Sequence, residues 1–275
     1  MRNSFLAKMF TGRLNAMSFA LVLLPIAIAL CGPLLAPYSY DEPVGGAGDL
    51  PSEAFPLGTD ALGRDVLSRV LQGGFSIVGL GMVSTLLAYL PGVAIGLFAG
   101  FRANSVSHLL VGIVDMLLVL PSIVLMLVIT AGLGPSIPTL LLSVVLVQLP
   151  SIARLVRISA AEISNAGYIE VALARGDGLT RILFKEIFPN VSHILLADAG
   201  VRFGWSITLI TSMNYLGLGL PPPIADWGLM IAENREFLNA NPWSVLGPAV
   251  LLGFLTIGVS SALDSYTHAR GRLTR

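Results

Sequence analysis

The feature that most constrains this chain is a set of long segments without any charged residue. The longest, residues 116–153, holds thirty-eight residues in a row without Asp, Glu, Lys or Arg. As a single helix it would be about 57 Å long, whereas the hydrocarbon core of a bilayer is about 30 Å thick. We therefore expect this segment to turn, and residues 132–135, with two glycines and a proline, provide the break.

The overall composition is that of an integral membrane protein. Of the 275 residues, 55% are hydrophobic and 12% are charged, whereas about a quarter are charged in soluble domains. A soluble enzyme is excluded on this ground. The formal net charge of zero leaves no basic face for nucleic acid. The three histidines are scattered without metal-ligand spacing, so no metal site is expected.

The uncharged runs predict an all-α, polytopic membrane protein with six transmembrane helices. We expect the spans near residues 16–37, 70–101, 107–131, 137–156, 190–217 and 244–266. The predicted organisation is a segment 1–15, a transmembrane domain 16–266, outer loops 38–72 and 218–243, a cytoplasmic loop 158–189, and a tail 267–275.

Charge asymmetry gives the predicted orientation. Twelve of the sixteen basic residues fall in segments predicted to lie inside, and the outer loops hold only Arg64, Arg69 and Arg235. Because loops rich in Lys and Arg stay in the cytoplasm, both termini are expected to be cytoplasmic. An even number of spans agrees with this.

A charged segment at residues 168–190 separates two of the apolar runs. Apolar residues recur at helical spacing on both sides of Gly176 and Gly178, and a glycine costs about 1 kcal/mol in a helix interior. We therefore predict two short helices joined at a glycine corner, with the second helix ending at Pro189.

The spacing of four residues in this segment resembles the EAA loop of membrane-spanning subunits of bacterial ATP-binding-cassette importers: Glu170, Ala172, Gly176 and Pro189. The stretches 56–65 and 216–221 extend the resemblance to the dipeptide, oligopeptide and nickel permease family, specifically its shorter, C-type partner. The likeness covers residues from about 16 to about 245. The signature departs from the usual pattern at Val171 and Phe188.

The resemblance implies a permease subunit of the bacterial inner membrane that forms half of a path for peptides or similar small solutes. It also implies a homologous permease as heterodimer partner, two ATPase subunits, and a periplasmic or lipid-anchored substrate-binding protein. Both lysines follow residues other than glycine, so no Walker-type Gly-Lys pair exists. We expect ATP and Mg²⁺ to bind the partner ATPases and no cofactor to bind this chain.

The alternative function is a self-sufficient, ion-coupled secondary transporter or channel subunit, which would need no cytoplasmic docking loop. For the loop itself, the alternative is an amphipathic interfacial helix. Under the resemblance, small side chains would let an ATPase subunit approach closely and charges would set the register. The expected docking residues are Glu170, Ala172, Ala174, Arg175, Gly176 and Pro189.

The first outer loop contains a second candidate group, expected to form a folded cap with tight turns and local bonds. We favour a structural turn over a direct contact with substrate. The residues of this predicted cap are Gly58, Asp60, Gly63, Arg64 and Asp65.

Three charged residues inside predicted spans form the last candidate group: Asp115, Asp198 and Arg202. An ionised residue near a helix centre costs about 2.5–3.5 kcal/mol on insertion scales, so these residues should face the bundle interior in pairs. Asp198 and Arg202 are four apart and share a helix face. We expect Arg202 to pair with Asp198 and also with Asp115, as a link between helices rather than as a gate or substrate contact.

Overall fold

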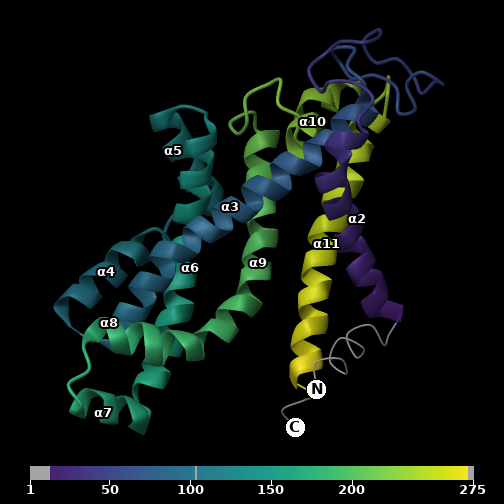
Figure 1. Ribbon diagram of the computed structural model, residues 1–275. Helices are drawn as coiled ribbons and strands as arrows, with labels where there is room; N and C mark the ends of the chain where they lie inside the picture. The colour runs from purple at the N-terminus through teal and green to yellow at the C-terminus, as the bar shows by residue number, and fades with distance from the viewer. Residues whose placement is uncertain (1–12, 103, 272–275) are drawn as a thin grey trace.

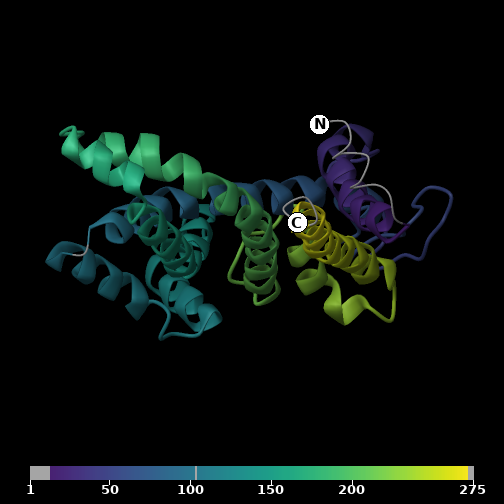
Figure 2. The ribbon, with the colours of Figure 1, turned by 90° about the horizontal axis from the view of Figure 1, so that it is seen from below.

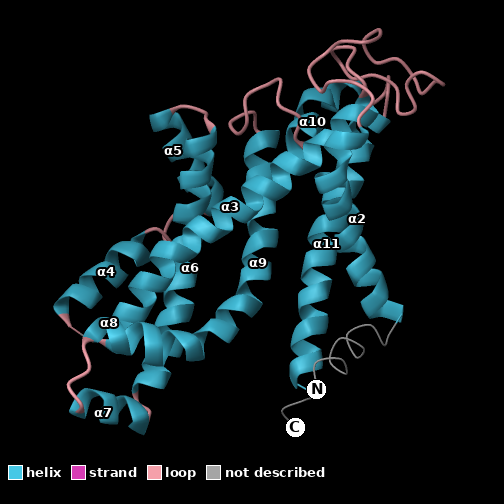
Figure 3. Ribbon diagram, viewed as in Figure 1, coloured by secondary structure: helices cyan, strands magenta, loops and turns pink. Residues whose placement is uncertain are grey.

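The computed structural model describes residues 13–102 and 104–271, and the regular structure in these ranges is helical (Figure 3). Two isolated bridges occur within residues 43–65. The elements are α2 (Arg13–Leu35), α3 (Val66–Phe101), α4 (Ser105–Met116), α5 (Ser122–Leu133), α6 (Ile137–Ser164), α7 (Gly167–Ala174), α8 (Leu179–Arg181), the π-helix η1 (Ile182–Ile187), α9 (Phe188–Tyr215), α10 (Trp227–Asn234), the 3₁₀-helix η2 (Arg235–Phe237) and α11 (Trp243–Gly271).

Helix α3 runs diagonally through the molecule and organises the other helices (Figure 1). Helices α2, α10 and α11 lie beside its first half, and α4, α6 and α8 lie near its second half. Seen from below, α9 stands between these two groups (Figure 2). The start of α2 and the end of α11 lie at the same end of the molecule as α7, opposite the loop before α3 (Figure 1).

Four helices of the described residues are long and apolar enough to cross a membrane. They are α3, α6, the stretch Leu179–Tyr215, and α11 as far as Ala262. Helices α4 and α5 provide a fifth span if the bent pair counts as one, and the apolar part of α2 is shorter, Ala20–Leu35. The predicted all-helical membrane fold is confirmed, whereas the count of six spans stays a prediction.

The prediction of a continuous third span over residues 107–131 is wrong. Helices α4 and α5 meet at 97°, with Pro121 at the N-terminal boundary of α5. Proline has no amide hydrogen and disfavours helical geometry in the residue before it, so the helix stops and restarts in a new direction. The predicted break at residues 132–135 is also present, where α5 ends at Gly134 with φ +80°.

The prediction that the second loop helix ends at Pro189 is also wrong. Helix α8, the π-helix η1 and α9 follow one another without a break. The amide of Phe188 donates to the carbonyl of Leu183, five residues earlier. Pro189 offers no hydrogen and its ring would crowd a normal helical turn, and the wider π turn just before it accommodates the ring.

Helices α3 and α6 pack at very short range along three glycines of α3 that are four residues apart, Gly92, Gly96 and Gly100. A Cβ atom added at Gly96 would lie 2.5 Å from Cβ of Val156 and 2.7 Å from the carbonyl oxygen of Ala153. Small residues at this spacing let membrane helices bring their backbones close together. The α3–α6 contact therefore holds the second half of α3 rigidly.

Buried apolar side chains gather in two main clusters. The first joins α3, α9, α10 and α11 and contains Ile77, Ile210 and Trp227. The second joins the end of α3 to α6, α7 and η1 and includes Leu97 and Ile152. The second cluster therefore connects the membrane helices to the predicted docking loop.

We expect Gly96→Ala to destabilise the protein by about 1–3 kcal/mol, because the added methyl group overpacks the contact with α6. Gly79→Ala is the matched control, since no atom lies within 4 Å of a Cβ placed there in the same helix. Thermal unfolding of the purified proteins in detergent measures the difference. Equal midpoints for the two variants would contradict the close packing.

Candidate functional site

Helix α7 is held against the rest of the chain by one buried edge. Ile169 and Ala172 are completely buried, in the same cluster as Ile182 and Ile187. Ala172 was predicted to contribute to a surface for an ATPase subunit, and this is wrong, because its side chain packs inside the chain. Its small size instead lets α7 lie close to the following helix.

The glycine corner after α7 is closed by a local ion-pair group. Gly176 has φ +75°, a conformation that other residues rarely adopt, and no atom lies within 4 Å of a Cβ placed there. Asp177 pairs with Arg175 at 3.0 Å and with Arg181 at 3.3 Å. Arg175 therefore braces the corner, while its side chain stays 58% exposed.

Three large apolar side chains of α7 remain about half exposed: Tyr168, Val171 and Leu173. The predicted docking residues Glu170 and Ala174 are exposed beside them. Sequence reasoning concentrated on the small and charged residues and missed these three. The sequence does contain a sign of them, because α7 has more apolar residues than a single buried edge of a helix can accommodate. Exposed apolar groups that the chain leaves uncovered are typical of a contact surface for another protein.

In the loop before α3, a largely buried group of four charges joins the loop to α3 and α10. Oδ2 of Asp60 lies 2.7 Å from Nε of Arg64 and 2.7 Å from Arg69. Oε2 of Glu233 lies 2.9 Å from Arg64 and 3.0 Å from Arg69. Arg69 and Glu233 were not among the predicted cap residues, since nothing in the local sequence shows that α10 returns to this loop.

The remaining cap residues form tight turns and a helix cap. Gly58 and Gly63 have φ near +71° and +75°. Asp65 accepts hydrogen bonds from the amide of Ser68 at 2.8 Å and from its hydroxyl at 2.6 Å, and so caps the start of α3. Asp60 and Asp65 are fully buried, and these bonds favour the structural interpretation of the cap over direct substrate contact.

Within the membrane helices, Asp198 links α9 to α3. Its Oδ2 accepts hydrogen bonds from Nε of Arg202 at 3.1 Å and from the hydroxyl of Tyr89 at 2.7 Å. Tyr89 was not predicted as a member of this group. A tyrosine inside an apolar run gives no sign of its partner until the two helices are placed side by side.

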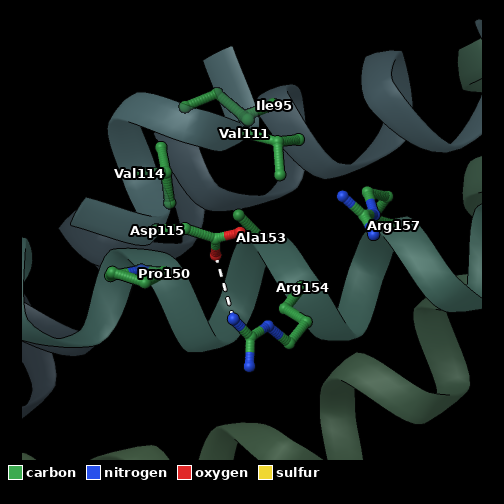
Figure 4. Close-up of a pocket in the computed structure, with 8 residues that line it drawn as sticks. All are labelled: Ile95, Val111, Val114, Asp115, Pro150, Ala153, Arg154 and Arg157. Atoms are coloured by element: carbon green, nitrogen blue, oxygen red, sulfur yellow. Dashed lines mark hydrogen bonds and ion pairs between the residues drawn. The ribbon is translucent and has the colours of Figure 1, made fainter. Parts of the chain in front are cut away.

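The predicted pairing of Asp115 with Arg202 is wrong. Asp115 pairs with Arg154 of α6 at 3.0 Å, and both side chains are about half exposed. Figure 4 shows the Asp115 carboxylate and the Arg154 guanidinium meeting beside a small pocket between α4 and α6. The chain bends directly after α4, so Asp115 does not reach α9. It lies instead beside Arg154 of α6, the first charged residue after the uncharged run 116–153.

Residues 92–269 match the family described as binding-protein-dependent transport system inner membrane component. The chain belongs to this family. It is 33% identical over 267 residues to the di/tripeptide transport system permease protein DppC of Pseudomonas aeruginosa (strain UCBPP-PA14), covering 92% of this chain and 88% of the relative. It is 35% identical over 248 residues to the dipeptide transport system permease protein DppC of Alkalihalophilus pseudofirmus (strain ATCC BAA-2126 / JCM 17055 / OF4), covering 87% and 81%.

The oligopeptide transport system permease protein OppC of Bacillus subtilis (strain 168) is 28% identical over 262 residues, covering 92% of this chain and 86% of that protein. The predicted membership of a permease family is therefore confirmed.

This inner membrane component also contains a buried polar link that sequence reasoning missed. The hydroxyl of Ser206 in α9 accepts a hydrogen bond from Nε2 of Gln148 in α6 at 2.6 Å. It lies 2.8 Å from the hydroxyl of Thr85 in α3. All three side chains are buried. Such a link between three helices fixes their register where water is excluded.

A second missed group lies at the start of α10. Oδ1 of Asp226 accepts hydrogen bonds from Asn214 at 2.7 Å, Gly228 at 2.9 Å and Leu229 at 3.2 Å. Its other oxygen, Oδ2, is buried without a hydrogen-bond partner in the described chain. Burial raises the pKa of Asp226 from 3.8 to about 6.

We expect Asp60→Asn in this inner membrane component to lower stability by about 3–5 kcal/mol, because it leaves two buried guanidinium groups with one carboxylate. Glu53→Gln, an exposed acid of the same loop, should have no measurable effect. Thermal unfolding in detergent compares the two variants. A small, equal effect of both substitutions would show that the buried charge group contributes little to the fold.

The raised pKa of Asp226 makes stability depend on pH. The folded protein holds this proton more tightly than the unfolded chain, so the contribution of Asp226 to stability falls as pH rises from about 4 to above 6. Asp226→Asn keeps the acceptor atom that receives all three hydrogen bonds. We expect the variant to be more stable than the parent at pH 7, and this advantage to be smaller at pH 4.5, where the Asp226 carboxyl of the folded parent is still protonated.

Unfolding midpoints of the two proteins at both pH values measure this difference. A variant that is less stable by the same amount at pH 7 and pH 4.5 would contradict it. The remaining pH dependence of the variant includes that of Glu233, whose pKa burial also raises.

Proposed function

We propose that this chain is the permease subunit of an ATP-binding-cassette importer and forms half of the path for peptides or similar small solutes. The observation that carries the proposal is the exposed apolar surface of α7, in a loop whose residue spacing resembles the EAA loop. Membership of the inner membrane component family supports it. So do the names of the relatives, which are di/tripeptide, dipeptide and oligopeptide transport system permeases.

The proposed assembly has three kinds of partner. A homologous permease completes the path as the other half of a heterodimer, and two ATPase subunits, which hold ATP and Mg²⁺, dock on the loop that contains α7. A substrate-binding protein delivers the solute to the outer loops. In this arrangement the protein is a multi-pass component of the inner membrane with both termini in the cytoplasm, and it catalyses no reaction of its own.

The loop has the geometry that mechanical coupling requires. Movement of an ATPase subunit would be applied to the exposed side of α7, near Glu170 and Leu173. Ile169 and Ala172 fix the opposite edge of α7 to the cluster that contains Ile187. Because η1 continues into α9 without a break, a displacement of α7 would tilt a membrane-spanning helix.

Leu173→Asp should weaken association with the ATPase subunits by about 10- to 100-fold, since burying a carboxylate in place of an apolar side chain removes a favourable contact and adds a desolvation cost. Co-purification of the ATPase and ATP-dependent uptake in proteoliposomes measure the effect. Val106→Asp is the control, because Val106 is 55% exposed in the first turn of α4 and outside the α7 loop.

Normal association and uptake with Leu173→Asp would contradict docking on α7. The alternative function is tested in the same proteoliposomes. Uptake that follows an imposed ion gradient without ATP or ATPase subunits would support a self-sufficient secondary transporter instead.

A further inference from the structure

Helix α9 carries a polar stripe along one face. We define the α9 stripe as the residues spaced three or four apart from the middle of the helix to its end: Asp198, Arg202, Trp205, Thr208, Ser212 and Tyr215. Trp205 and Tyr215 are 47% and 46% exposed. The opposite face, with Ile207 and Ile210, is buried against the other helices. The chain itself therefore leaves Trp205, Thr208 and Tyr215 of the α9 stripe exposed and covers its other members only in part.

The position of the two charged residues decides what can cover this stripe. Arg202 lies at the middle of α9, fourteen residues after Phe188 and thirteen before Tyr215. Thr208 and Ser212 bond to backbone carbonyls of the preceding turn, so their hydroxyls alone would tolerate lipid. A carboxylate and a guanidinium at this depth would not, because ionised groups in spans face protein or a water-filled cavity.

The Asp198–Arg202 pair is only partly satisfied within the chain. Both bonds to Asp198 go to Oδ2, from Tyr89 and from Nε of Arg202. In the described residues, Oδ1 of Asp198 and the two terminal nitrogens of Arg202 make no hydrogen bond. The side chains are 17% and 19% exposed. The pair therefore keeps an acceptor and several donors available.

A cavity continues the stripe at the end of α9. Its volume is about 340 Å³, and its lining includes Ser212 and Tyr215 of the stripe, Ile123 of α5 and Ile231 of α10. Thr211 also lines it, and the Thr211 hydroxyl oxygen is buried without a hydrogen-bond partner in the described chain. The polar face of α9 thus leads into a hollow between three helices.

We infer that the α9 stripe lines the water-filled path and that the Asp198–Arg202 pair contacts the charged ends of a zwitterionic peptide. The ammonium group of the peptide would bind the free Oδ1 of Asp198, and its carboxylate would bind the terminal nitrogens of Arg202. Charge complementarity identifies this class of solute. The inference rests on the proposed function, since it names the residues by which such an importer touches its cargo.

Cysteine accessibility tests whether the stripe faces water. In a Cys31→Ser background, which removes the only cysteine, Val201→Cys places a thiol beside the pair at a position that is 56% exposed. Leu196→Cys is the control, on another face of the same helix and 75% exposed. In the full complex in proteoliposomes, a membrane-impermeant methanethiosulfonate should label Val201→Cys and leave Leu196→Cys unlabelled.

The charge of the reagent tests whether the pair acts on a charged solute. Asp198→Asn should lower the labelling rate of Val201→Cys with a cationic reagent, relative to an anionic one, by about fivefold. Arg202→Gln should shift this ratio in the opposite direction. An excess of alanyl-alanine should slow labelling, whereas the same dipeptide with acetylated and amidated ends should not.

Each outcome bears on the inference. An unlabelled Val201→Cys overturns it, because the stripe then faces lipid or is covered by the partner permease. The role of the pair is overturned if the labelling rate does not depend on the charge of the reagent. It is also overturned if both peptides slow labelling, or if neither does. Failure of the proposed function is separate, since it would appear as a lack of ATP-driven peptide uptake by the Cys31→Ser complex itself.

Discussion

The close contact between α3 and α6 is the constraint on which the rest of the structure depends. Because lipid tails are as apolar as the side chains, there is no hydrophobic driving force between membrane helices, and the helices associate through close packing and polar links. Gly96 brings the backbones of these two helices together, and the Thr85–Ser206–Gln148 link adds α9 to them. The cap at one end of α3 and the α7 loop at the other are both anchored to this rigid unit.

The two ends of the molecule are anchored by different forces. At the end that carries the loop before α3, Asp60 and Glu233 each contact both Arg64 and Arg69, and Asp65 caps α3. At the opposite end, α7 is fixed by apolar burial of Ile169 and Ala172. Apolar contacts lack fixed directions and tolerate small sliding movements better than short ion pairs, which suits a loop proposed to move with an ATPase subunit.

The sequence predicted the features that depend on long uniform patterns. Uncharged runs placed the membrane helices, and Gly176 marked the corner of the loop. The sequence did not predict the bend at Pro121, because a proline inside an apolar run is also common within a continuous span. Ala172 was misassigned because a small residue in a short helix serves either a buried edge or an exposed surface, and only the position of η1 distinguishes the two.

The pairing of charges could be predicted only between residues that are close in the sequence. Asp198 and Arg202 are four residues apart, so their contact follows from helical geometry. Asp60 also pairs with Arg64 of the same loop, in line with the local bonds predicted for the cap. The partners of Asp115, Glu233 and Tyr89 are distant in the sequence and depend on a bend or crossing that the sequence does not specify.

The two charge groups also differ in how far the chain encloses them. In the cap before α3, Asp60 and Glu233 each meet two guanidinium groups, which gives a neutral group suited to holding a loop in place. In α9, Asp198 and Arg202 share a single short contact and keep polar atoms available at the middle of a membrane span. The unbonded polar atoms of the cap, such as Nε of Arg69, are enclosed by the protein, whereas the unbonded atoms of Asp198 and Arg202 are not among the enclosed ones and can reach a partner outside the chain. The free atoms of the α9 pair are therefore better explained by a partner outside the chain, in water or in the solute that passes.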